Sequence, residues 1–168
     1  HTRLQGDWSS DVCSSDLKPN AQYYLIANLE WDFMNIYLIK NNQLTYIRNS
    51  SLCFKDMVEL AKNAGPDKKI VKEEKVLNIL AAKNIFEPTK KDMTSDDEIG
   101  HKIYVEIWPY LEKISMELKK ALYSLTHKKE IPEDYKAFLS GEFLNINQVN
   151  DYFTKELDHM VETLNVEK

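Results

Sequence analysis

Residues 23–48 decide the fold of this chain: YYLIANLEWDFMNIYLIKNNQLTYIR. They contain three apolar runs, at 23–29, 33–40 and 43–48, each of strand length and rich in aromatic and β-branched residues. Asn41–Asn42 separates the second run from the third, and asparagine tolerates the positive φ of a two-residue hairpin turn. The stretch therefore predicts a three-strand antiparallel meander.

The second predicted strand is apolar on both faces. Met34, Ile36 and Leu38 alternate with Tyr37 and Ile39. A sheet with one face in water shows polar residues at every second position, so we expect both faces of this sheet to be covered.

Helices are expected after the meander. Apolar spacing predicts one helix over 52–61 that covers the sheet and stops at Gly65–Pro66, and a more polar one over 67–87. The longest helix is predicted over 95–125, where Ser95 and Glu98 have the spacing of a capping box. Pro109 should kink or divide it, because proline lacks the amide hydrogen.

The last third of the chain predicts a strand and a helix. Residues 135–139 form a short apolar run closed by Ser140–Gly141. A helix follows, capped by Asn145 or Asn147. Residues 160–164 are compatible with either a helix or a strand.

Composition indicates one soluble domain. The chain has 168 residues, of which 43% are hydrophobic and 29% charged, and no apolar run reaches the roughly 18 residues of a membrane span. The net charge of -5 argues against a general electrostatic affinity for nucleic acid or anionic lipid. No signal peptide is recognisable at the start, so we expect a cytoplasmic location with no direct membrane insertion.

Residues 6–17, GDWSSDVCSSDL, lack any apolar period. Their back-translation reads as a short-read sequencing adapter joined in frame to a gene, so we predict that 1–17 is an artefactual or disordered segment. A natural Ser/Asp-rich arm is the other interpretation. With this segment set aside, Cys53 is the only cysteine, and its apolar neighbours favour a packing role.

Several stretches resemble the type IV pilus assembly PilM-like proteins, which are related to the FtsA-like cell-division proteins. They are 24–30 with 35–44 and Arg48, the helix 114–125, the strand 137–141, and 161–165. The resemblance implies a ribonuclease H-like/actin-like half: an α/β second domain over 18–168, with a helical insertion at about 67–95 and a strand at the end. It also implies that the first phosphate loop and an interaction subdomain lie upstream of this chain, and that the partners are proteins of an inner-membrane assembly complex.

The same resemblance aligns Asn28, Glu30, Asn35 and Gly141 with the nucleotide-facing positions of the family. Of these four residues, only Asn35 and Gly141 match the residue type that the family has at the aligned position. Asn28 stands where the family has a magnesium-organising Asp, Glu30 replaces a phosphate-loop glycine, and Met34 replaces a hydroxyl donor. Glu142 and Cys53–Phe54 also replace glycines, so we expect vestigial loops with no resident cofactor in this chain. ATP and Mg²⁺ binding remains an expectation only for the full-length protein.

Other candidate chemistry is weak. His101, His127 and His159 are scattered without metal-ligand spacing, and Asp96–Asp97–Glu98 fits a helix N-terminus better than a Ca²⁺ loop. We therefore predict no metal site and no catalytic residue. The aromatic residues Trp31, Phe33, Trp108 and Tyr110 favour core packing, and a partner-binding patch is the alternative.

Three functions remain open from the sequence. The first is a non-catalytic scaffold or interaction domain with degenerate nucleotide loops. The second is a fragment of an active actin-superfold ATPase or sugar kinase, in which Asn28, Glu30 and Gly141 line a modified site. The third is an unrelated α/β interaction module, which would lack the meander-helix-strand order.

Overall fold

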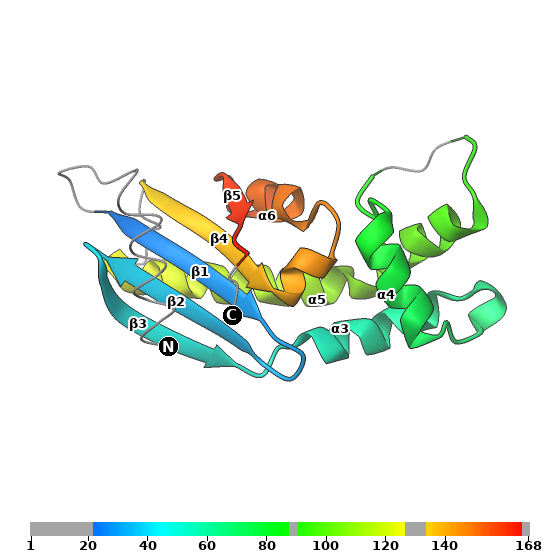
Figure 1. Cartoon of the computed structure of the whole chain (residues 1–168), viewed down its shortest axis with the longest axis horizontal. Coiled ribbons are helices and arrows are strands. Elements are labelled where there is room, and N and C mark those ends of the chain that lie inside the picture. The colour runs from blue at the N-terminus through cyan, green and yellow to red at the C-terminus, as the bar shows by residue number, and fades with distance from the viewer. Residues whose placement is uncertain (1–21, 88–90, 127–133, 166–168) are drawn as a thin grey trace.

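The structure is a computed structural model that describes residues 22–87, 91–126 and 134–165. The predicted adapter-derived segment and His127 lie outside these residues. Within the described part, five strands and four α-helices build an elongated molecule, with the sheet at one end and a group of helices at the other (Figure 1).

The sheet is mixed, in the order β3-β2-β1-β4-β5. β1 (Tyr23–Leu29), β2 (Met34–Lys40) and β3 (Gln43–Ser50) form the predicted antiparallel meander. β4 (Tyr135–Gly141) and β5 (Val161–Thr163) extend it in parallel on the other side of β1, so the ambiguous segment 160–164 contributes a strand.

The hairpin between β2 and β3 turns at the predicted pair. Asn41 and Asn42 have φ of 52° and 66°. This left-handed conformation is costly for most L-residues, but the short polar side chain of asparagine tolerates it. The prediction of a two-residue turn is confirmed.

Four helices connect and cover the strands. They are α3 (Phe54–Ala61), α4 (Glu73–Ala82), α5 (Ser95–Thr126) and α6 (Val149–Leu157). α5 runs behind the sheet and continues past its edge, and α3 and α4 pack near its first half (Figure 1). The prediction that the first helix covers the sheet is wrong: α3 leads away from the end of β3 and packs on α5, while α5 lies behind the sheet and α6 contacts β5 (Figure 1).

Three features of α4 and α5 differ from the prediction, for local reasons. α4 begins six residues later than predicted, because Asp67 takes a φ of 53° in a short 3-10 turn and the chain is extended at Lys69. Pro109 lies inside α5 and does not divide it, so of the two predicted effects of this proline the division is wrong. Its capping box is Thr94 with Asp97, one residue before the predicted pair: the Asp97 amide donates to Thr94 Oγ1 at 3.2 Å, and the Thr94 amide donates to Asp97 Oδ2 at 3.0 Å.

The N-terminus of α6 also differs from the prediction. Gln148, in a left-handed conformation, precedes the helix, and no side chain caps it. Asn145 instead donates from Nδ2 to Glu142 Oε2 at 3.1 Å, and the Asn147 amide donates to the Leu80 carbonyl at 2.7 Å. Neither predicted capping residue performs that role.

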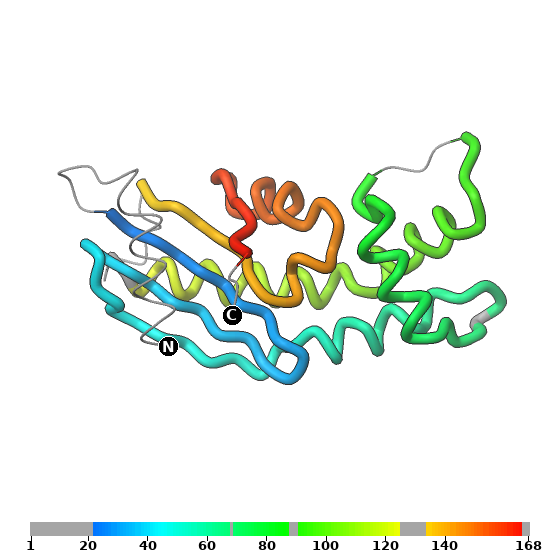
Figure 2. The backbone as a smooth tube through the Cα atoms, in the orientation of Figure 1, coloured from blue at the N-terminus to red at the C-terminus, as the bar shows by residue number. Residues whose placement is uncertain are grey.

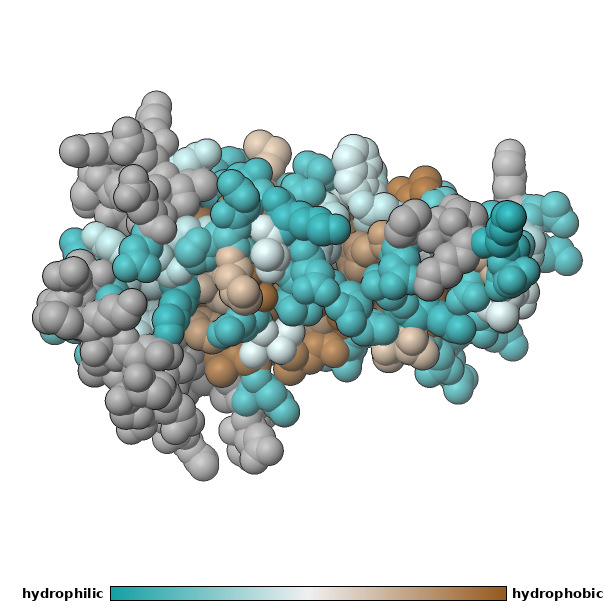
Figure 3. Space-filling view, turned by 90° about the horizontal axis from the view of Figure 1, so that it is seen from above, coloured by the Kyte–Doolittle hydropathy of each residue, from teal (hydrophilic) through white to brown (hydrophobic). Residues whose placement is uncertain are grey.

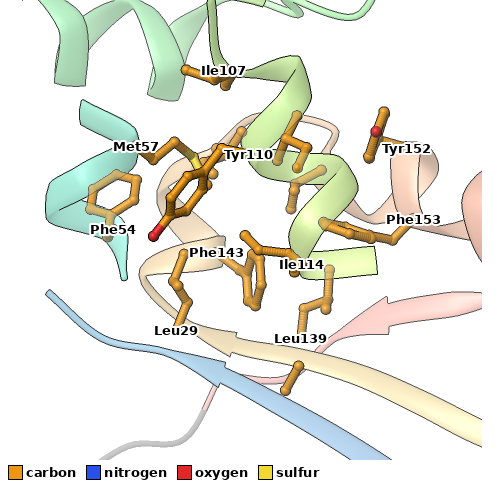
Figure 4. Packing of buried hydrophobic residues seen from close by; sticks show 14 of the residues in the cluster. Leu29, Phe54, Met57, Ile107, Tyr110, Ile114, Leu139, Phe143, Tyr152 and Phe153 are labelled. Atoms are coloured by element: carbon orange, nitrogen blue, oxygen red, sulfur yellow. The ribbon is translucent and has the colours of Figure 1, made fainter. Parts of the chain in front are cut away.

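One core lies between the helices and the sheet. Figure 4 shows Ile107, Tyr110 and Ile114 of α5 over Leu29 and Leu139 of the sheet. The other face of the sheet carries a second buried cluster, made by Tyr24, Ile26, Tyr37, Ile39 and Phe138. Both faces of β2 are therefore buried, as its sequence predicted. The surface seen from above is mostly hydrophilic, with hydrophobic side chains in separate patches (Figure 3).

Candidate functional site

The candidate site lies where β1 and β4 end. These strands are parallel neighbours, so their carboxyl ends meet at one edge of the sheet (Figure 2). In α/β sheets with parallel strands, ligands commonly bind beyond such ends. The register places Ser140 beside Asn28 and Gly141 beside Leu29, while Asn35 on β2 lies directly opposite Asn28.

The polar residues of this edge share one face of the sheet. Along β1, Ala27 and Leu29 belong to the helix-side core and Ile26 to the opposite cluster, so alternation puts Asn28 on the side away from the helices. Asn35 and Ser140 lie on the same side, because they are the cross-strand partners of Asn28. The fold thus brings together three of the four predicted nucleotide-facing residues, Asn28, Glu30 and Gly141, and places Asn35 beside them.

The Asn28 side chain is held from two directions. Its Oδ1 accepts a hydrogen bond of 2.9 Å from Ser140 Oγ, and its Nδ2 donates one of 2.8 Å to Glu30 Oε1. Ser140 is buried, so the bond to Asn28 satisfies its hydroxyl. The carboxylate of Glu30 therefore stays next to the end of β1.

Backbone amides around this turn are also engaged. The Glu30 amide donates to the Phe33 carbonyl at 2.8 Å. The first two amides of α3, on Phe54 and Lys55, donate to the carbonyls of Glu30 and Trp31, each at 3.0 Å. A phosphate loop presents free amides to its ligand, whereas these three amides already have acceptors within the protein.

Gly141 has a structural reason to be glycine. Its φ is 71° and its ψ is -136°, a conformation open almost only to glycine. A Cβ atom at this position would lie 2.3 Å from the Leu29 carbonyl oxygen and 2.7 Å from Asn28 Oδ1. The close packing of β4 on β1 is therefore sufficient to explain the glycine.

Asn35 does not join the network of Asn28. Its Nδ2 donates to the Tyr37 hydroxyl at 3.3 Å, two residues along β2. Ser140, which sequence reasoning assigned only to a strand end, is the missed member of the site. The parallel pairing of β1 with β4 identifies it, and that pairing joins residues 112 positions apart in the chain.

No group of three or more His, Cys, Asp or Glu residues suited to a metal ion occurs in the described residues. Hydrogen bonds from the amide and hydroxyl of Thr94 and from Lys83 lower the pKa of Asp97, consistent with a helix-capping role. A cavity of about 350 Å³ lies along α4, lined among others by Lys72, Lys75 and Asp96, and shares no residue with the turn after β1.

The aromatic residues divide into two groups. Tyr110 is buried, and Trp31 packs edge-on against Phe54 with ring centroids 5.9 Å apart, so the core-packing prediction is confirmed for Tyr110 and in part for Trp31. Phe33 and Trp108 are exposed, and for them the prediction is wrong. Cys53 is buried, as expected.

No protein-family model matches this sequence, and a search of curated proteins found no match either. Solved structures do match. The PilM–PilN type IV pilus biogenesis complex aligns with a TM-score of 0.58 and 16% identity over 86% of this chain and 36% of that one. The ethanolamine utilization protein EutJ from Carboxydothermus hydrogenoformans aligns with a TM-score of 0.58 and 14% identity, over 84% of this chain and 43% of EutJ. MreB5 of Spiroplasma citri bound to ADP aligns with a TM-score of 0.57 and 9% identity, over 84% of this chain and 48% of MreB5.

The chain thus spans less than half of each of these neighbours, while they cover most of it. Identities this low show the fold alone. In the described residues, no helix combines the length and the hydrophobicity needed to cross a bilayer. Because the five-strand sheet and its helices align with parts of actin-fold proteins, the chain has the α/β fold of half an actin-like ATPase.

Proposed function

We propose that this chain is an interaction domain of a PilM-like protein that acts through protein contacts rather than ATP hydrolysis. The setting is a type IV pilus or secretion-system assembly at the cytoplasmic face of the inner membrane. The observation that carries the proposal is the hydrogen-bond network at the ends of β1 and β4. In it, Ser140 donates to Asn28, and Asn28 donates to Glu30. A match to the PilM–PilN complex among the solved structures supports the family.

The charge and the hydrogen bonds of this network both argue that it binds nucleotides weakly or not at all. A carboxylate at Glu30 repels the phosphates of ATP, and its own hydrogen bond to Asn28 holds it in place. The three engaged amides of Glu30, Phe54 and Lys55 would have to give up their present acceptors before they bound a phosphate. Both effects oppose the binding of Mg-ATP at the positions that the resemblance aligns with the nucleotide loops of the family.

Calorimetric titration with Mg-ATP tests this proposal. It should be run on this chain and on the protein translated from the complete gene, because the chain spans only part of its structural neighbours. We expect no saturation below about 1 mM in either sample. The double variant Asn28→Asp/Glu30→Gly of the longer protein should bind more tightly than the unaltered protein. A sub-micromolar dissociation constant in the unaltered protein contradicts the proposal.

A second experiment tests the protein partner. The longer protein should co-purify with the PilN-type protein of the same cell, and the complex should form equally well with and without Mg-ATP. A complex that forms only in the presence of Mg-ATP would speak for a working nucleotide switch.

The alternative is an active actin-superfold ATPase or sugar kinase with a modified site at Asn28, Glu30 and Gly141. It is favoured by the ADP bound to MreB5 among the structural neighbours. Phosphate release from ATP by the longer protein, abolished by both Asn28→Ala and Glu30→Gln, would establish it. Glu30→Gln leaves both the packing of Gly141 and the bond between Asn28 and buried Ser140 in place, so a loss of turnover in this variant would not simply reflect misfolding.

A further inference from the structure

An aromatic cluster joins α5 and α6 to the segment after α4. The ring of Phe86 lies edge-on to Tyr104 of α5, with centroids 5.4 Å apart, and is stacked on Tyr152 of α6 at 5.1 Å. Tyr104 and Tyr152 meet edge to face at 6.3 Å. Tyr152 is buried, whereas Phe86 and Tyr104 are half-buried at the margin of the core. This aromatic cluster, defined by Phe86, Tyr104 and Tyr152, therefore presents parts of two rings at the surface.

Two carboxylates border the aromatic cluster. Glu112 lies two turns after Tyr104 on α5, and Glu156 lies one turn after Tyr152 on α6. Both glutamates are half-buried, and both raise the pKa of Tyr104 and of Tyr152, so their negative charges lie near the two hydroxyls. None of the salt bridges recorded among the described residues includes either glutamate. Two partly desolvated like charges without a cation are an unfavourable arrangement.

The Tyr152 hydroxyl is a further unsatisfied group at the same place. Tyr152 is 8% exposed, and its oxygen is buried without a hydrogen-bond partner in the structure. After burial, the nearby charge of Glu156 raises its pKa most. In Figure 4, Tyr152 lies farther from the sheet than its neighbour Phe153. Buried polar atoms usually have a partner, and this one lies beside two carboxylates that also lack a cation.

We propose that the aromatic cluster, with Glu112 and Glu156, binds the guanidinium group of an arginine side chain from a partner protein. The faces of aromatic rings carry negative partial charge and attract cations. A guanidinium stacks on such faces and donates pairs of hydrogen bonds to carboxylates. In the bound arrangement Glu156 accepts from the guanidinium and from the Tyr152 hydroxyl, so the buried hydroxyl gains its acceptor.

Charge and shape select this occupant. Both side chains whose permanent charge shifts the pKa of the two tyrosines are glutamates, so the site attracts a cation. The ammonium of a lysine is more strongly hydrated than a guanidinium and has no planar face to stack on a ring.

A partner protein fits this surface better than a free small cation. The two cavities beside α4 are lined by other residues, so the cluster lies at an open surface that would enclose a small ligand poorly. Trp108, which is 46% exposed, lies between Tyr104 and Glu112 on the same row of α5 and extends the contact available to a larger partner. The inference does not depend on whether the ends of β1 and β4 bind a nucleotide.

Titration of the isotope-labelled 168-residue chain with N-acetylarginine methylamide, followed by NMR, tests the site. The amide signals of Tyr104, Glu112, Tyr152 and Glu156 should shift and saturate with a dissociation constant of about 1–10 mM. The citrulline analogue, which has the same shape without the charge, should give no saturable shift. The lysine analogue should bind at least about threefold more weakly than the arginine probe. Equal binding of either analogue, or shifts confined to other residues, overturns the proposal.

Four variants separate the site from stability. Glu112→Gln and Glu156→Gln should each weaken binding of the arginine probe at least about threefold. Asp151→Asn removes an exposed carboxylate of α6 outside the cluster and should bind like the unaltered chain. Tyr152→Phe should bind more weakly while its unfolding midpoint stays unchanged or rises, because the hydroxyl has no partner in the free chain. Unchanged binding in both glutamate variants overturns the proposal.

The same titration of the protein translated from the complete gene distinguishes the two possible sources of the arginine. The longer protein should bind the probe as the chain does, because a separate partner protein leaves the site open. If only the shorter chain binds the probe, another part of the same protein occupies the site, and the proposal of a separate partner is overturned.

Discussion

The Tyr110 hydroxyl accepts a hydrogen bond of 2.7 Å from the backbone amide of Cys53, and this bond ties the middle of α5 to the start of α3. The two residues are 57 positions apart, and both are buried. In Figure 4 the Tyr110 hydroxyl points toward Phe54, the first residue of α3. Cys53 does not cap α3 with its side chain, and the tyrosine acts together with the carbonyls of Glu30 and Trp31, which bind the first two amides of the helix.

Tyr110→Phe should lower the free energy of unfolding by about 1–3 kcal/mol, because it leaves the Cys53 amide buried without an acceptor. Urea denaturation followed by circular dichroism measures the loss. Tyr135→Phe is the matched control, since the Tyr135 hydroxyl is buried with no hydrogen-bond partner in the structure. Its removal should be neutral or stabilising. Equal losses in both variants would contradict the assigned role of the Tyr110 bond.

Alkaline pH should destabilise the protein through its buried tyrosines, among them Tyr110 and Tyr135. Burial raises the pKa of Tyr110 and of Tyr135 to about 12. In the unfolded chain both ionise near pH 10, so the unfolded state binds fewer protons than the folded state above that pH. The contribution of each tyrosine to the free energy of unfolding is fully present below pH 10. It falls by about 1.4 kcal/mol per pH unit as the pH rises toward 12.

Unfolding in urea at pH 9 and at pH 11 measures this loss. Tyr135→Phe should lose less stability between the two values than the unaltered chain, because phenylalanine does not titrate. If the two proteins lose the same amount, Tyr135 ionises as readily in the folded state as in the unfolded state.

Gly141→Ala should destabilise the protein by at least about 2 kcal/mol, because it adds a Cβ that collides with the Leu29 carbonyl to a residue with a positive φ. Gly100→Ala is the control: this glycine lies inside α5, and its added Cβ would contact Ile85 at 3.3 Å and Ile79 at 3.5 Å. Alanine gains about 1 kcal/mol of helix propensity there, which offsets the tight contact. Thermal unfolding distinguishes the two substitutions, and a tolerated Gly141→Ala would remove the structural explanation for this glycine.

How far the sequence predicts the structure depends on the range of the interactions. The meander follows from alternation and from Asn41–Asn42, which are local signals, and these predictions are confirmed. The position of α3 was predicted wrongly because its apolar face is compatible with a sheet or with another helix, and only tertiary packing selects α5. Helical spacing detects an apolar stripe without identifying what it contacts.

The candidate site shows the same limit. Asn28, Glu30 and Gly141 were found through a resemblance, and the fold does bring them together. Ser140 was missed as a site residue because its hydrogen bond to Asn28 depends on two parallel strands that lie far apart in the chain. The sequence also could not predict that the backbone amides of the turn are hydrogen-bonded within the protein, because backbone hydrogen bonds have no sequence signature of their own.

Arg48 and Glu117 should couple in a double-mutant cycle. Arg48 Nε lies 2.6 Å from Glu117 Oε2, and the side chains are 34% and 21% exposed. This pair joins β3 to α5, and its partial burial reduces screening by solvent, so we expect about 0.5–1 kcal/mol of coupling between Arg48→Ala and Glu117→Ala. The pair Lys62–Glu59 at the end of α3, in which Glu59 is more exposed, should show a smaller coupling energy. A coupling that vanishes for Arg48–Glu117 would show that the pair contributes only side-chain packing.

The capping box of α5 gives the most local prediction. Thr94→Ala removes the hydroxyl that accepts from the Asp97 amide and should cost about 1 kcal/mol. Ser95→Ala, at the first helical residue, removes a hydroxyl with no recorded role in the cap and should be close to neutral. Sequence spacing alone favoured Ser95 with Glu98, so urea denaturation of these two variants decides directly between the two registers. A larger loss for Ser95→Ala would place the start of α5 one residue later and would restore the pair that the sequence pattern favoured.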